Sequence, residues 1–136
     1  MGIIGEYILV AERIMTIIDV HGRLANTALL YAIILGVWGL WRFVRKQNMD
    51  SNFWGAIVIA EILFLFQIIL GLYLWLSGVG ELSSGVHILY GVVSVMVLPG
   101  IYLYTRGDEK RRALLIYTAG FLFLVGILIR AMMTAG

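Results

Sequence analysis

Four long apolar runs separated by short polar stretches leave this chain few ways to fold. They cover approximately residues 22–44, 52–76, 84–104 and 113–133. Each has about 20 residues or more, the length that crosses about 30 Å of hydrocarbon as a helix. A backbone inside a bilayer must satisfy its own hydrogen bonds, and these runs are too long for barrel strands. We therefore predict an all-α integral membrane protein, an up-down-up-down four-helix bundle in a single domain over residues 1–136.

The composition excludes a water-soluble fold. Hydrophobic residues make up 62% of the 136 residues and charged residues 13%, whereas soluble domains have about 45–50% and about 25%. Because a small soluble domain buries only part of its apolar surface, the bilayer must be the solvent. Cysteine is absent, which excludes disulfides, thiolate metal sites, iron–sulfur clusters and covalently attached haem.

The basic residues gather in two of the three loops and predict the orientation. Loops 42–52 and 105–112 hold seven Lys and Arg residues, whereas the loop between the second and third spans has no basic residue and one acid, Glu81. The positive-inside rule places both basic loops in the cytoplasm and both termini outside. We predict a protein of a prokaryotic inner (plasma) membrane that contacts membrane lipids and no nucleic acid.

Residues 3–18 precede the first span and have a pattern of their own. At 100° per residue, their apolar side chains cover one half of the helical wheel, while Glu6, Glu12 and Arg13 fall in the other half. We predict an amphipathic helix that lies on the outer interface. A continuation of the first span is the alternative.

The chain has only two histidines, His21 and His87, and each lies at the outer start of a predicted span. His21 precedes Arg42 by 21 residues and His87 precedes Arg106 by 19, so their depths differ by only about 3 Å. In such a bundle the first and third helices face each other diagonally across the core. Two imidazoles that face each other in this way can supply both axial ligands of a haem iron.

Small residues follow each histidine on its own helix face, since positions four and seven residues on share the face of the first residue. Below the two histidines they are Ala25, Ala28, Ala32, Gly36 and Gly39 on the first helix and Gly91 and Ser94 on the third. The other two helices add Gln67, Gly71, Gly78 and Gly126. We interpret these residues as a slot for a flat macrocycle, with Ala25, Gly71 and Gly91 as its cofactor-binding residues. Ordinary close helix packing is the alternative.

Two further charged residues lie inside predicted spans. Arg130 is near the outer end of the fourth span on the face of Gly126, and we predict that it binds a haem propionate by a charge-assisted hydrogen bond. Snorkelling to the outer headgroups is the alternative. Glu61 lies about three turns into the second span, where a charge is costly. It is protonated, paired with a partner subunit, or part of a proton path to a quinone.

Part of the sequence resembles one four-helix half of the haem A synthase family. The resemblance is carried by residues 67–71 (QIILG), residues 77–78 (SG) and His87 at the start of the next span. Residues 19–23 (DVHGR) are similar to the family motif of an acidic residue followed by His-Arg, with Asp for Glu and a Gly between His and Arg. The similarity covers approximately residues 19–100. Because each half of that family has a His pair on non-adjacent helices, the resemblance implies a single haem-holding site.

These features predict a membrane-embedded b-type cytochrome. One haem b is bound by His21 and His87 near the outer face, and the protein transfers electrons as a subunit of a larger oxidoreductase complex. One alternative is a half-size haem-modifying enzyme of the haem A synthase type, working as a homodimer. Another is a cofactor-free or chlorophyll-holding scaffold subunit, although a chlorophyll magnesium needs only one histidine. The sequence has no hydrolytic, nucleophilic or phosphate-binding motif, which favours an electron-transfer subunit over a stand-alone enzyme.

Overall fold

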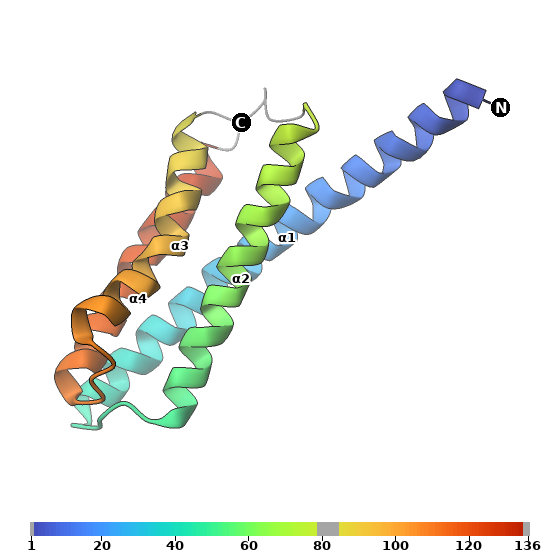
Figure 1. Cartoon of the computed structure of the whole chain (residues 1–136). Helices are drawn as coiled ribbons and strands as arrows, with labels where there is room; N and C mark the ends of the chain where they lie inside the picture. Colours follow the sequence, from blue (N-terminus) through green and yellow to red (C-terminus); the bar gives the residue numbers. More distant parts are fainter. Residues whose placement is uncertain (1, 79–84, 135–136) are drawn as a thin grey trace.

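A computed structural model describes residues 2–78 and 85–134, and within these ranges every regular element is an α-helix. The helices are α1 (Gly2–Val44), α2 (Ser51–Leu76), α3 (Gly85–Thr105) and α4 (Arg111–Met133), as Figure 1 shows. All four are long and apolar enough to cross a membrane. The all-helical fold is confirmed, and the ends of α2, α3 and α4 lie within two residues of the predicted spans. The predicted outer loop with Glu81 lies outside the described residues.

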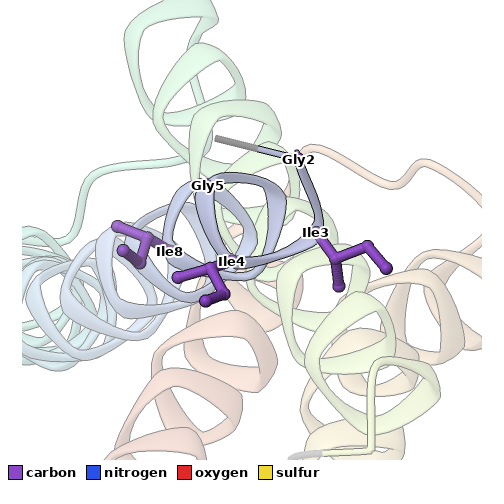
Figure 2. Close-up of a pocket in the computed structure, with 5 residues that line it drawn as sticks. All are labelled: Gly2, Ile3, Ile4, Gly5 and Ile8. Carbon is purple, nitrogen blue, oxygen red and sulfur yellow. The ribbon is translucent and has the colours of Figure 1, made fainter.

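Helix α1 differs from its prediction at the N-terminal end. It is one helix of 43 residues, about 64 Å long at 1.5 Å per residue. The prediction of a separate helix at residues 3–18 is wrong. These residues continue the first span, as the alternative proposed. Nothing breaks the helix at the expected junction, where Arg23 pairs with Asp19 at 3.0 Å one turn earlier. The first turns project beyond the other helices (Figure 1). Figure 2 shows their exposed apolar side chains Ile3, Ile4 and Ile8.

The helices contact one another in a ring, α1 with α2, α2 with α3, α3 with α4 and α4 with α1, so α1 and α3 are diagonal partners. The α1–α2 turn and the α3–α4 turn lie side by side at one end, called the loop end below (Figure 1). Met49 N donates to the Glu109 carbonyl oxygen at 2.9 Å, and Arg111 Nε donates to the Phe43 carbonyl oxygen at 3.0 Å. These two hydrogen bonds join the turns.

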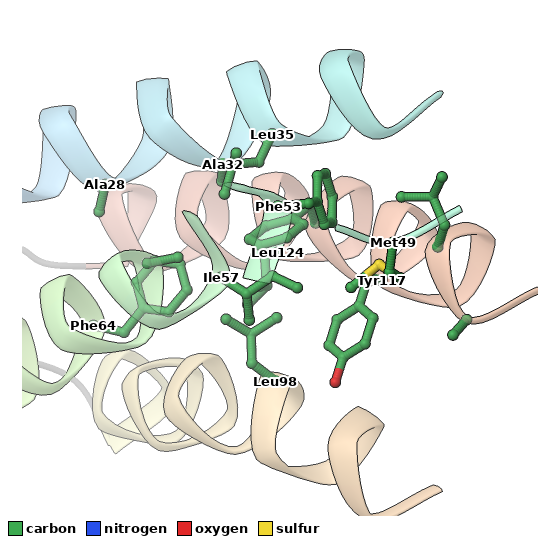
Figure 3. Close-up of a cluster of buried hydrophobic side chains, with 14 residues drawn as sticks. Ala28, Ala32, Leu35, Met49, Phe53, Ile57, Phe64, Leu98, Tyr117 and Leu124 are labelled. Atoms are coloured by element: carbon green, nitrogen blue, oxygen red, sulfur yellow. The ribbon is translucent and has the colours of Figure 1, made fainter. Parts of the chain in front are cut away.

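The half of the bundle next to the loop end holds the densest core. Phe53 and Tyr117 are fully buried there, and their rings pack against Trp38 at 5.1 Å and Trp54 at 5.5 Å between centres. The buried apolar side chains around them include Leu35, Met49, Ile57, Leu98, Leu114 and Phe121. Figure 3 shows how α1, α2, α3 and α4 all contribute to this cluster. Interlocking side chains therefore fix the helices at this end.

Two glycines of α1 mark its close approach to α4. A Cβ atom on Gly36 would lie 2.9 Å from the Leu122 side chain, and one on Gly39 would collide with the Thr118 hydroxyl. The small residues of this face, all buried, are Ala28, Ala32, Gly36 and Gly39. They are helix-packing positions, as in small-xxx-small motifs. The predicted macrocycle slot is therefore wrong along this part of α1.

Candidate functional site

His21 on α1 and His87 on α3 lie next to each other, far from the loop end. Their ring centres are 6.3 Å apart and their planes make an angle of 82°. Both side chains are half-buried. The diagonal placement of α1 and α3 brings the two rings together, and we call this part of the bundle the histidine end.

The separation of the rings fits two imidazoles on opposite sides of one metal ion. With a metal–nitrogen bond of about 2 Å and about 1.1 Å from ring centre to nitrogen, two such rings have centres about 6 Å apart. Residues 2–78 and 85–134 contain no group of three or more His, Cys, Asp or Glu side chains that could hold a metal ion. A two-histidine donor set of this kind suits haem, whose porphyrin supplies the other iron ligands, better than structural zinc.

The backbone of α4 orients His87. Its Nδ1 atom lies 2.7 Å from the carbonyl oxygen of Ala131. Because a carbonyl oxygen only accepts, Nδ1 carries the proton and donates it, which puts the ring lone pair on Nε2. Hydrogen bonds of this kind fix the tautomer and the orientation of metal-binding histidines. Ala131 is in the last turn of α4, and its carbonyl oxygen also accepts a hydrogen bond from the Thr134 hydroxyl at 3.1 Å.

The other helix at the site, α2, packs against His21. A Cβ atom on Gly71 would lie 3.3 Å from His21 Cε1, so the glycine makes room for the ring. Gln67, one turn earlier on the same face, also lies beside His21. His21 Nδ1 and Gln67 Oε1 are buried and form no hydrogen bond in the described part of the chain. Buried polar atoms without partners are rare in proteins, and these two belong to neighbouring side chains of the histidine end.

The remaining predicted site residues lie close to the pair in sequence, or next to Ala131. Ala25 and Gly91 lie one turn below the two histidines and are half-buried. A Cβ atom on Gly91 or on Gly126 would meet no atom within 4 Å, so these glycines border open space and do not serve helix packing. Arg130 directly precedes Ala131 and has an exposed side chain. Its contact with a propionate stays a prediction.

Three charged residues near or below the site take no part in it. Asp19 and Arg23, the charged members of the motif around His21, pair with each other at 3.0 Å and are exposed. Glu61 lies ten residues before Gly71 on α2, about 15 Å along the helix. Its Oε2 atom is buried without a hydrogen bond among the described residues. The histidine end is therefore built from two imidazoles, one amide, one backbone carbonyl and small residues.

One member of the site has no signal in the sequence. The Ala131 carbonyl is a backbone group, so no side chain in the sequence marks it. Its contact with His87 depends on its position in the last turn of α4, at the depth of that ring.

Comparisons with protein-family models, with curated proteins and with solved structures find no match. The resemblance to haem A synthase rests on the residues quoted above.

Proposed function

We propose that this chain is a membrane-embedded b-type cytochrome that holds one haem b between His21 and His87 and transfers electrons. The observation that carries this proposal is the 6.3 Å separation of the two rings. The hydrogen bond from His87 Nδ1 to Ala131 supports it, because it leaves Nε2 with the lone pair that a metal needs. When bound, the haem supplies one-electron redox chemistry at its iron.

The residues at the histidine end have distinct roles in this proposal. His21 and His87 would hold the haem iron, and a haem held by two protein ligands would supply electron transfer rather than catalysis on a bound substrate. Gly71 makes room for the His21 ring. Gln67 Oε1, which is buried beside that ring, is suited to accept a hydrogen bond from His21 Nδ1, as the Ala131 carbonyl oxygen does from His87 Nδ1. Arg130 stabilises a propionate.

The proposed orientation is an up-down-up-down bundle with the loop end in the cytoplasm. It is supported by the seven Lys and Arg residues of loops 42–52 and 105–112, which the joined turns bring to one end. The histidine end and both termini then face outward across a prokaryotic inner membrane. The haem lies near the outer face.

We also propose that the chain works within a larger redox complex. The first turns of α1 carry exposed apolar side chains beyond the other three helices, a surface suited to another membrane subunit or to a second copy. Glu61, half-buried within the second apolar helix, is the candidate contact for a partner subunit or a quinone. The electron donor and acceptor are then neighbours in that complex.

The test is a reduced-minus-oxidised absorption spectrum of the purified full-length protein in detergent. We expect a sharp α band of a low-spin haem, and we expect it to vanish in both His21→Ala and His87→Ala. Asn26→Ala is the matched control, because Asn26 is exposed on α1 close to His21 and its loss leaves the band unchanged. Added imidazole restores the band in His21→Gly, which shows that the variant has kept its fold.

Three results contradict the proposal. One is a wild-type protein that is fully inserted and helical but binds no haem, which leaves the scaffold alternative. The other is a chemically modified haem after incubation with haem O and a reductant, which identifies an enzyme of the haem A synthase type. A band that survives both histidine substitutions also rejects the proposed ligands.

A further inference from the structure

A groove with a charged rim opens on the outside of the bundle at the loop end, between the end of α3 and the start of α4. Residues that line it include Leu103, Tyr104, Arg106, Asp108, Arg112 and Ile116. The apolar lining residues belong to the membrane-length helices, and the charged ones lie in the turn or at the first residues of α4. The groove thus joins an apolar wall to a polar rim.

The rim carries positive charge that other residues do not neutralise. Neither Arg106 nor Arg112 forms an ion pair within residues 2–78 and 85–134. Arg112 instead donates to the Tyr104 hydroxyl at 3.3 Å. The one carboxylate of the rim, Asp108, accepts a hydrogen bond from the backbone N–H of Lys110 at 3.1 Å. Two guanidinium groups therefore face a single acid.

Other arginines at the loop end are occupied in holding the turns together. Arg42 pairs with Asp50 at 3.2 Å, and Arg111 donates to the Phe43 carbonyl oxygen and lies 4.1 Å from the centre of the Phe43 ring. In the described part of the chain, Arg106 and Arg112 form no side-chain hydrogen bond to the α1–α2 turn. Their side chains are exposed at the rim of the groove.

We infer that this groove binds an anionic phospholipid. The phosphate lies between Arg106 and Arg112, since guanidinium groups match phosphate oxygens in geometry and charge. An acyl chain lies along Leu103 and Ile116, which are within one helical turn of the two arginines. Basic pockets between membrane helices bind anionic headgroups in this way. A ligand with an anionic head and an apolar tail fits both parts of the lining, whereas free phosphate fits only the rim.

The test is native mass spectrometry of the full-length protein with dioleoylphosphatidylglycerol, compared with dioleoylphosphatidylcholine as the neutral lipid. We expect one tightly retained phosphatidylglycerol and no retained phosphatidylcholine. The double variant Arg106→Gln/Arg112→Gln lowers the affinity for phosphatidylglycerol by about tenfold or more. The matched control Arg45→Gln/Lys46→Gln removes two charges from the other turn of the same end and lowers it less than about twofold.

A third variant distinguishes binding of the whole lipid from binding of its headgroup alone. Leu103→Ser keeps every charge but weakens acyl-chain contact, and we expect a loss of about threefold for phosphatidylglycerol and no change for glycerol phosphate. Equal losses in the two double variants would mean a diffuse surface charge and would overturn the inference. So would equal retention of the two lipids, or an acidic polypeptide bound through Arg106 and Arg112 in place of lipid. Circular dichroism and gel filtration verify that each variant is folded.

Discussion

Two regions of this bundle, the α1–α4 contact and the histidine end, differ in what their glycines touch. In the half next to the loop end, Gly36 and Gly39 lie so close to α4 that an added methyl group would force the Leu122 or Thr118 side chain to shift. In the half next to the histidine end, Gly91 and Gly126 border open space. The first half buries aromatic rings against one another, whereas the second brings the two imidazole rings of His21 and His87 to 6.3 Å between centres. A small residue in a membrane helix can therefore mark either a close contact with another helix or a position without such a contact. Only the residues around it in space distinguish the two cases.

This difference divides the molecule into a part that holds the fold and a part that is suited to hold a ligand. Lipid tails are as apolar as leucine, so membrane helices associate mainly through close packing. The packed half satisfies that requirement through the contacts of α1 with α4 and through the joined turns. Among the described residues, the buried core cluster includes none from the turns that carry His21 and His87.

The largest expected effect follows from removing a ligand. We predict that His21→Ala abolishes haem binding but changes the free energy of unfolding of the haem-free protein by less than about 1 kcal/mol, because its ring is half-buried and supports no packed core. Haem content and unfolding in sodium dodecyl sulfate measure the two quantities. A collapse of the haem-free fold would show that the histidine end also holds the bundle together.

In the packed half, Phe53→Ala should lower the free energy of unfolding by about 3 kcal/mol, the cost of a cavity in a closely packed interior. Phe53 is fully buried. Phe66 on the same helix is 56% exposed, and Phe66→Ala is the matched control, with a loss below about 0.5 kcal/mol. Unfolding in sodium dodecyl sulfate measures both. Similar losses for the two variants would contradict the division into halves.

Gly39 and Gly91 allow the effect of one added methyl group on stability to be compared between the two halves. Gly39→Ala forces a methyl group onto Thr118 and should destabilise the protein by about 1–3 kcal/mol. Gly91→Ala meets open space and should change stability by less than about 1 kcal/mol, since alanine favours a helix. Thermal unfolding of the two purified variants tests this pair. An equal loss at Gly91 would mean that this position is packed after all.

Gly71 lies on α2 beside the histidine pair, and Gly71→Ala places a methyl group 3.3 Å from His21 Cε1. The ring must move by a few tenths of an ångström. We therefore expect haem affinity to fall by about tenfold, as for other changes in the residues that orient a metal ligand. Gly55→Ala on the same helix, where an added methyl group meets nothing within 4 Å, should leave haem affinity unchanged. Haem titration of both variants measures the difference.

The smallest effect concerns a single hydrogen bond between α1 and α2. The Tyr31 hydroxyl donates to the Ala56 carbonyl oxygen at 2.8 Å. Tyr31→Phe should lower the free energy of unfolding by about 0.6–1 kcal/mol and leave haem binding unchanged. A large loss of haem in this variant would show that the α1–α2 contact controls the histidine end.

Much of the fold is predictable from the sequence, because membrane helices must be long and apolar. The ends of α2, α3 and α4 follow directly from the apolar runs. The pairing of His21 with His87 follows from their equal depth on diagonal helices. Three features depend on neighbours in space and are not visible in the sequence pattern. They are the continuity of α1 past Asp19, the packing role of Gly36 and Gly39, and the Ala131 carbonyl that orients His87.

The central claim is that His21 and His87 share one metal centre. Pulsed electron paramagnetic resonance of the oxidised protein, purified with ¹⁵N-labelled histidine, tests it most directly. We predict a low-spin ferric haem coupled to two histidine nitrogens, with one coupling lost in His21→Gly and replaced by that of unlabelled imidazole when it is added. A haem coupled to a single histidine nitrogen, or no haem signal from the fully inserted protein, would contradict the claim.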